Sequence, residues 1–172
     1  QRRTQIAQPI IQVLAGFPAP MLYPLVLGIL IPLGVNLGWS SMFLMTLGVQ
    51  WYVLFNVLAG ALRLPQELGD ALSLMQISTY NRWTKLYLPS VFPALVTGWV
   101  TAAGGAWNAS IVAEYIAYKG QTLSTIALGA TISAAAEKAN FPELAASIAA
   151  MIVVVLTLNR TVWNRIYALS QN

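Results

Sequence analysis

Leu64–Pro93 reads LPQELGDALSLMQISTYNRWTKLYLPSVFP and is a polar, charged stretch between two long apolar runs. Thr4–Leu62 before it and Leu86–Ala113, which begins within its last residues, contain no Asp, Glu, Lys or Arg. Soluble domains carry about a quarter of their residues as charged side chains, so uncharged runs of this length are typical of membrane spans. The sequence therefore predicts that this stretch contains a water-facing loop between spans.

Composition supports a membrane protein and excludes several other classes. The chain is 58% hydrophobic and 8% charged, with a mean hydropathy of +0.66. Its net charge of +4 comes from a few scattered basic residues and not from a basic face, which argues against nucleic-acid binding. The sequence has no Cys and no His, and it lacks the Gly-rich phosphate-loop pattern. We therefore expect no enzyme activity, metal site or cofactor in this chain.

Hydropathy divides the chain into spans and connecting segments. Together these segments predict an all-α membrane protein whose residues 1–172 form one transmembrane domain. Four prolines interrupt the first apolar segment, so we expect a broken span there, either structural or lining a pathway. Before it, residues 1–12 resemble an amphipathic interfacial helix. The expected parts are four spans near 13–35, 41–62, 86–113 and 144–163, a loop at 64–85 and an external segment at 115–143.

The basic residues give the orientation of this layout. If the 64–85 loop is cytoplasmic, seven of the nine basic residues lie on the cytoplasmic side: Arg2, Arg3, Arg63, Arg82, Lys85, Arg160 and Arg165. Only Lys119 and Lys138 then lie outside. Cytoplasmic loops are enriched in Lys and Arg, so this orientation is the favoured one.

A short helix is expected inside the loop. Pro65 suits a first helical turn, and Glu67 and Asp70 complement the positive end of the helix dipole. Apolar residues recur at helical spacing from Leu68 to Met75. We therefore predict an amphipathic helix over Gln66–Ile77. A partner subunit or the membrane surface could cover its apolar face, and its acidic residues disfavour an anionic membrane surface.

Polar residues near the spans are candidates for a solute pathway. Gln50 and Asn56 lie within the second span, where amides either bond between helices or line a pathway. Asn108, Ser110 and Glu114 follow the small-residue run of the third span. Glu114 either has a functional role or caps a loop. In the external segment, Leu123–Ala136 has helical character and predicts a re-entrant or surface helix.

The loop resembles the cytoplasmic signature of binding-protein-dependent ABC importer permeases. That pattern is Glu-Ala-Ala, three residues, Gly, nine residues, an aliphatic residue, one residue and Leu-Pro. Ala71, Leu86, Leu88 and Pro89 match it, whereas Asp70, Leu72 and Gln76 depart from it. Three longer runs resemble the nitrate, sulfonate and taurine branch of that family: PIIQVLAGFPAPMLYPLVLG, NVLAGALRLPQELGDAL and KLYLPSVFPALVTGWVTAAGGAWNASIVAEY.

The resemblance implies a type I ABC importer helical bundle in the bacterial inner membrane, and this chain would be the C-terminal part of a longer permease. Such a subunit moves a small solute, possibly a small anion. Its implied partners are an ATPase subunit that binds ATP, a second permease half and a solute-binding protein. The second half could be identical, different or fused. The implied coupling residues are Glu67, Asp70, Ala71, Leu72, Met75, Gln76, Arg82 and Pro89.

Two other functions remain open from the residues alone. An ATP-independent channel or secondary transporter needs embedded acids or broken helices to hold an ion, and Glu114 is the one acid close to a span. The departures at Asp70, Leu72 and Gln76 leave room for a membrane assembly subunit that transports nothing.

Overall fold

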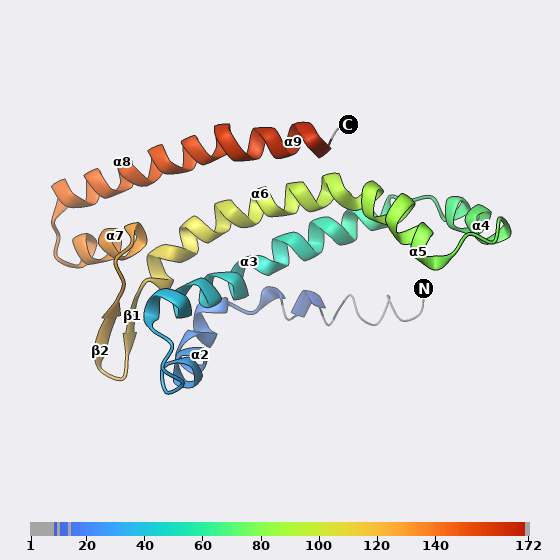
Figure 1. Ribbon diagram of the computed structural model, residues 1–172. Helices are drawn as coiled ribbons and strands as arrows, with labels where there is room; N and C mark the ends of the chain where they lie inside the picture. The colour runs from blue at the N-terminus through green and yellow to red at the C-terminus, as the bar shows by residue number, and fades with distance from the viewer. Residues whose placement is uncertain (1–8, 10, 14, 171–172) are drawn as a thin grey trace. The chain divides into compact units, whose positions relative to one another are not determined.

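The computed structural model describes residues 9, 11–13 and 15–170, and helices dominate it (Figure 1). The predicted all-α membrane fold is confirmed apart from one short hairpin. The predicted interfacial stretch, residues 1–12, lies almost wholly outside the described residues. The elements in chain order are η1 (Ala19–Leu22), α2 (Tyr23–Leu30), α3 (Leu37–Leu62), α4 (Gln66–Leu74), α5 (Thr79–Arg82), the π-helical η2 (Trp83–Tyr87), α6 (Leu88–Ala113), β1 (Tyr115–Tyr118), β2 (Gln121–Ser124), α7 (Leu128–Glu137), α8 (Phe141–Leu158), the π-helical η3 (Asn159–Trp163) and α9 (Asn164–Ser170).

Three helices in the described part of the chain are long and apolar enough to cross a membrane, against the four spans expected. They are Leu37–Leu62, Thr79–Ala113 and Phe141–Ala168. The second is longer than predicted because α5, η2 and α6 follow one another without a break. The return limb of the water-facing loop is therefore already helical at Thr79.

The first apolar segment contains the apolar helix Ala19–Leu30, which is shorter than the three candidate spans. Proline is the second residue of both η1 and α2, within the first turn, where the missing amide hydrogen costs little. The helix then ends in a turn in which the amide of Val35 donates to the carbonyl of Leu30 at 3.1 Å, and Gly34 has a φ of 80°. Glycine takes this conformation without a steric penalty. The segment is thus broken, as its prolines predict.

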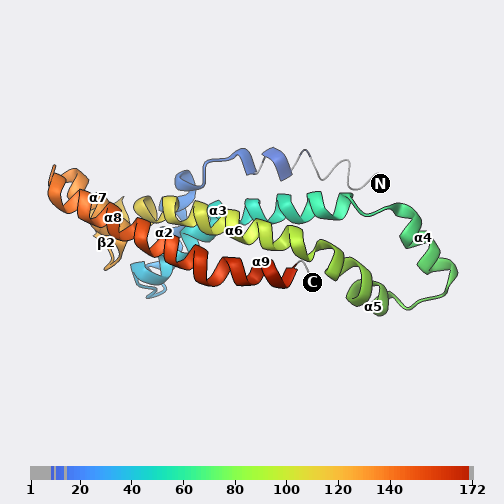
Figure 2. The same cartoon turned by 90° about the horizontal axis from the view of Figure 1, so that it is seen from above.

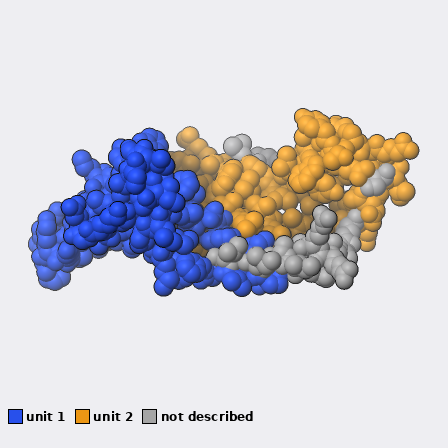
Figure 3. Space-filling view, turned by 90° about the horizontal axis from the view of Figure 1, so that it is seen from below, with its two compact units in different colours: residues 1–51, 105–150 blue, residues 52–104, 151–172 orange. Residues whose placement is uncertain are grey.

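The chain divides into two compact units (Figure 3). Residues 1–51 and 105–150 form unit 1, and residues 52–104 and 151–172 form unit 2. The core of unit 1 consists of the buried side chains of Tyr23, Leu27, Leu44 and Ala113. Tyr118 packs against this core, so the segment after α6 is held to the first apolar helix.

An antiparallel hairpin, β1–β2, occupies the start of the segment for which a helix was predicted from Leu123 onwards. That prediction is wrong at its beginning, because α7 starts only at Leu128. The hairpin turns at Lys119 and Gly120, whose φ values of 50° and 76° match a two-residue turn with both residues left-handed. Lys-Gly is a weaker signal for this turn than Asn-Gly, which is why the pattern went unrecognised.

Two α-helices end in a turn with a left-handed residue that is not glycine. At the end of α7, Ala139 has a φ of 52°, and the amide of Asn140 donates to the carbonyl of Ala135 at 2.9 Å. This six-to-one bond is the Schellman motif, which usually places glycine at the left-handed position. The second instance is Gln76, at the end of α4.

Close approach between α3 and α6 defines the helical part of unit 2. A Cβ atom on Gly98 would lie 2.9 Å from the Cα of Val53, so the two backbones touch there. A Cβ atom on Gly60 would lie 2.5 Å from the Cβ of Ala94. Small residues permit this approach, and in a membrane such packing is a main source of helix association.

Candidate functional site

The water-facing loop leaves the end of α3 through a tight turn and starts a new helix at once. The amides of Arg63 and Leu64 donate to the carbonyls of Gly60 and Ala61 at 3.2 and 3.3 Å. Pro65 follows and has no amide hydrogen to satisfy. α4 then begins at Gln66 with Glu67 in its first turn, where a negative charge is favourable. The predicted short helix is therefore present, with Leu74 as its last residue.

A Schellman turn at Gln76 ends α4. The amide of Ile77 donates to the carbonyl of Leu72 at 3.2 Å, and Gln76 has a φ of 54°. Gln76 stands where the permease signature has glycine, so the turn has stayed in place and glutamine has adopted the glycine conformation. A left-handed backbone costs a residue with a Cβ atom about 1 kcal/mol.

Replacing this residue tests the cost directly. We expect Gln76→Gly to raise the free energy of unfolding by about 0.5–1 kcal/mol, because glycine adopts the left-handed backbone without strain. The side chain of Gln76 is exposed, so its loss costs little. Gln76→Ala is the matched control and should give no such gain, since alanine keeps the Cβ atom. Denaturation midpoints of the purified protein in detergent measure both variants. Equal midpoints for the glycine and alanine variants would contradict the assignment.

The return limb is fixed to the turn by side chains at its start. Ser78 caps α5, its Oγ accepting a hydrogen bond from the amide of Asn81 at 3.4 Å. The Nε of Arg82 donates to the carbonyl of Ile77 at 2.9 Å. Arg82 therefore ties the first turn of the return limb to the residue that closes α4. Figure 2 shows α4 and α5 joined by this turn.

A π-helical turn, η2, precedes Pro89, one of the predicted coupling residues. The amide of Leu88 donates to the carbonyl of Trp83, five residues earlier. Proline cannot donate to the carbonyl four residues before it, and its ring crowds that carbonyl. A π turn is a frequent adjustment at such points and occurs often at functional sites. The return limb thus stays helical through its prolines.

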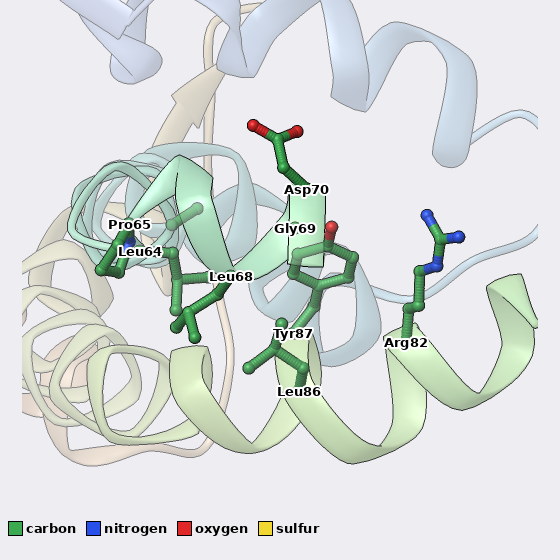
Figure 4. Close-up of a pocket in the computed structure, with 9 residues that line it drawn as sticks. Leu64, Pro65, Leu68, Gly69, Asp70, Arg82, Leu86 and Tyr87 are labelled. Carbon is green, nitrogen blue, oxygen red and sulfur yellow. The ribbon is translucent and has the colours of Figure 1, made fainter. Parts of the chain in front are cut away.

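Two cavities flank α4 within unit 2. One, of about 460 Å³, is lined by Leu64, Leu68, Asp70, Arg82 and Tyr87 among others (Figure 4). In Figure 4 the carboxylate of Asp70 points away from the leucine and proline side chains. The second cavity, of about 440 Å³, is mostly apolar, and its lining is Leu68, Ala71, Leu72, Met75, Ile77, Asn81, Lys85 and Leu86.

The tip of the loop exposes large apolar side chains outside the three long apolar helices or at their margin. Leu74 is 86% exposed, Met75 72% and Tyr80 75%. Lipid contact explains exposed apolar residues within a span, but it does not explain them on a short helix in a polar loop. Large apolar side chains exposed together are typical of a site of contact with another molecule.

The amides predicted within the second span bond inside their own helix. The Nδ2 of Asn56 donates to the carbonyl of Tyr52 at 2.8 Å, and the Nε2 of Gln50 donates to that of Leu47 at 3.3 Å. Neither bond joins two helices. Asn108 has an exposed side chain on α6. Gln50 and Asn108 belong to unit 1 and Asn56 belongs to unit 2, and the place of these residues in a pathway stays a prediction.

Ser110 and Glu114 are brought together where α6 meets α7. Ser110 is buried, and its Oγ donates to the carbonyl of Trp107 at 2.8 Å. The Oε2 of Glu114 accepts a hydrogen bond from the amide of Ala130 at 3.2 Å. The N-cap residue of α7, Ala127, has no side chain that can do this, so Glu114 caps the helix from a distant point in the chain.

Burial raises the pKa of Glu114 above its usual range, and the hydrogen bonds from Ala130 and Gly129 oppose that rise. Desolvation disfavours a charged carboxylate, while backbone donors favour it. At the next residue, the hydroxyl of Tyr115 donates to the carboxylate of Glu137, and this bond raises the pKa of Tyr115.

Sequence reasoning missed Gly129. A Cβ atom there would lie 2.5 Å from the Oε2 of Glu114 and 2.6 Å from the carbonyl carbon of Ser110. The only available signal was a glycine just inside a helix start, which is not specific.

The three long apolar helices define the class of the protein, which is an integral membrane protein. A structured loop between two of these helices exposes large apolar side chains. The family model for the binding-protein-dependent transport system inner membrane component matches residues 1–170. The chain therefore belongs to that family, as its loop signature predicts.

Three curated relatives agree with this assignment. The bicarbonate transport system permease protein CmpB of Synechocystis sp. is 29% identical over 77 residues, which is 45% of this chain and 28% of the relative. The nitrate import permease protein NrtB of Leptolyngbya laminosa is 25% identical over the same shares. That of Synechococcus elongatus is 24% identical over 108 residues, 63% of this chain and 37% of the relative. The chain thus spans about a third of the relatives' length.

Proposed function

We propose that this chain is part of a translocation subunit that moves a small solute across the bacterial inner membrane, driven by a separate ATPase. Family membership and the long apolar helices support a transport permease. The chain itself supplies no ATP-binding motif, so the proposed motor is a partner subunit. The other proposed partners are a second permease half and a solute-binding protein.

The observation that carries this proposal is the exposed apolar tip of the loop. α4 is joined to a long apolar helix through a short turn on each side, so force on α4 would reach both helices. Leu74, Met75 and Tyr80 offer an ATPase the apolar contact that a docking helix needs. We assign coupling to Glu67, Asp70, Ala71, Leu72, Met75, Gln76, Arg82 and Pro89.

The solute is proposed as small, in keeping with the nitrate and bicarbonate named for the relatives. No Arg or Lys lies within the apolar runs Thr4–Leu62 and Leu86–Ala113, so these helices offer no fixed positive charge for an anion. We place Gln50, Asn56, Asn108, Ser110 and Glu114 along or beside the pathway.

Site-specific crosslinking tests the coupling role, and the sequence has no native cysteine to interfere. Ser78→Cys places a thiol on the exposed turn between α4 and α5. In membranes that contain the intact transporter, we expect it to crosslink to the ATPase subunit with a yield that changes on ATP binding. Gln121→Cys on the hairpin is the control and should give no such product. Absence of a crosslink at Ser78 and at Tyr80, with the ATPase present, would overturn the proposal.

A further inference from the structure

The last long apolar helix contains a π turn at the point where its apolar run ends. α8 has 18 residues, which at the rise of an α-helix span about 27 Å, close to the thickness of the hydrocarbon core. η3 follows without a break, and the helix continues through α9 (Figure 1). η3 therefore begins at the level of the lipid headgroups, and it contains Trp163, an aromatic residue of the kind enriched there.

No proline accounts for this π turn. In η2 the following Pro89 gives a local reason for the irregular turn, whereas the sequence from Asn159 to the end contains no proline. The amide of Asn164 donates to the carbonyl of Asn159, five residues earlier. Single π turns inside α-helices are frequent at functional sites. The turn therefore indicates a role for the side chains that it brings together.

Those side chains are Arg160 and Arg165. In an α-helix, residues five apart point about 140° away from each other. Within a π turn, a residue and the fifth one after it lie one turn apart on the same side, as Asn159 and Asn164 do here. Arg165 has the same spacing from Arg160. The two guanidinium groups can therefore reach one ligand together.

The charges of this pair are not balanced on their own helix. Both arginine side chains are exposed, and no Asp or Glu follows Glu143 in the sequence. Guanidinium groups match phosphate oxygens with paired hydrogen bonds, and they lose less hydration on binding than an ammonium group does. A phosphate group at the membrane surface therefore suits the two arginines.

Apolar residues on the same side of the helix distinguish a lipid from a free phosphate compound. Leu156 and Val153 precede Arg160 by four and seven residues, so they share its face on the membrane side. Leu156 is 54% exposed and Val153 62%. An acyl chain can lie along these two side chains while its headgroup contacts the arginines.

We infer that Arg160 and Arg165 together bind the phosphate of an anionic phospholipid, whose acyl chain lies along Leu156 and Val153. Basic residues near a membrane surface attract anionic lipids. The bound lipid holds the end of the last span at a fixed depth in the membrane. The inference uses only this helix, so it does not rest on the proposed transport function.

Native mass spectrometry of the full-length permease tests the lipid preference. The protein is purified in detergent that contains equal amounts of phosphatidylglycerol and phosphatidylcholine with the same acyl chains. We expect the protein to retain phosphatidylglycerol in preference. Arg160→Gln and Arg165→Gln should each lower that retention by about tenfold, because charge-assisted hydrogen bonds are lost. Equal retention of the two lipids, or unchanged retention in both variants, would overturn the inference.

Arg63→Gln is the matched control, because it removes the same charge from another exposed arginine outside the pair and should keep the lipid bound. Loss of the lipid in this variant too would show a general effect of charge and would contradict the site. sn-Glycerol 3-phosphate, a soluble phosphate compound, should not displace the lipid at equal concentration. Displacement would indicate a site for free phosphate compounds and not for a lipid.

An exchange of two neighbouring residues tests the pairing across η3. Asn164→Arg combined with Arg165→Asn keeps the composition and net charge but places the second guanidinium four residues after Arg160. This double variant should lose as much lipid as Arg165→Gln, because the π turn aligns residues five apart. Retention equal to that of the unaltered protein would contradict the pairing.

Discussion

Replacing Gly129 with alanine is expected to lower the free energy of unfolding by about 2–3 kcal/mol, at the high end for overpacking. The new Cβ atom would lie 2.6 and 2.7 Å from the carbonyl carbon and oxygen of Ser110, which are backbone atoms. A flexible side chain could move aside, but a helix backbone cannot do so without displacing α6 from α7. The midpoint of thermal denaturation in detergent, followed by tryptophan fluorescence, measures the loss.

Gly104→Ala is the matched control for this experiment. Gly104 lies in α6, and a Cβ atom there would meet nothing within 4 Å in the chain. Alanine is the better helix former, so this variant should be more stable by about 0.5–1 kcal/mol. If Gly129→Ala matched the gain of Gly104→Ala, the close approach of α6 and α7 would not exist.

Gly60→Ala is expected to have a comparable effect in unit 2. Its new Cβ atom would lie 2.5 Å from that of Ala94, a separation that carbon atoms cannot adopt. The halves of α3 and α6 that belong to unit 2 would have to separate there. Because close van der Waals contact holds helices together in a membrane, we expect a loss of about 2–3 kcal/mol, measured as for Gly129→Ala.

The compensating exchange gives this prediction its sharpest test. The double variant Gly60→Ala with Ala94→Gly moves the methyl group from α6 to α3 and restores the space. The helix propensities of the two changes offset each other, so the double variant should unfold close to the unaltered protein. Additive destabilisation in the double variant would show that Gly60 and Ala94 do not face each other.

The membrane architecture could be predicted largely from the sequence, because charge is absent from long runs and concentrated between them. The start of α3 could also have been predicted from the sequence, because the residue before it is an asparagine. Asn36 caps that helix by accepting a hydrogen bond from the amide of Trp39 at 3.1 Å, so the helix begins at Leu37 and not near 41. Asparagine is a strong capping residue, whereas the span near 41–62 was bounded by hydropathy alone, which contains no information on helix caps.

The loop was predictable as a helix but not in its last turn. The helical spacing of apolar residues predicts a helix over Gln66–Ile77, whereas the helix in the structure ends at Leu74. Propensity gives no reason for glutamine to adopt a positive φ at position 76. The bond from Ile77 to Leu72 and the apolar cavity that both side chains line impose this conformation.

A cavity of about 300 Å³ at the start of α3, with Asn36, Glu114 and Thr125 in its lining, was not predictable because its residues come from distant parts of the chain. Asn36 and Thr125 are far apart in sequence, and the hairpin that brings Thr125 beside Glu114 was itself missed. Glu114 was singled out as an acid near a span, with capping and function as alternatives. The structure supports the cap directly, through the hydrogen bond from the amide of Ala130 to the Oε2 of Glu114.

The π turn at Trp83–Tyr87 affects how helical periodicity is read along the return limb. A bond that reaches five residues back encloses one residue more than an α-helical bond, so the faces on either side are offset by one position. Residues up to Arg82 therefore follow a different stripe from Leu88 and later residues, although both belong to one continuous helix. A helical wheel drawn across Thr79–Ala113 would mix the two stripes and hide the amphipathic pattern of each.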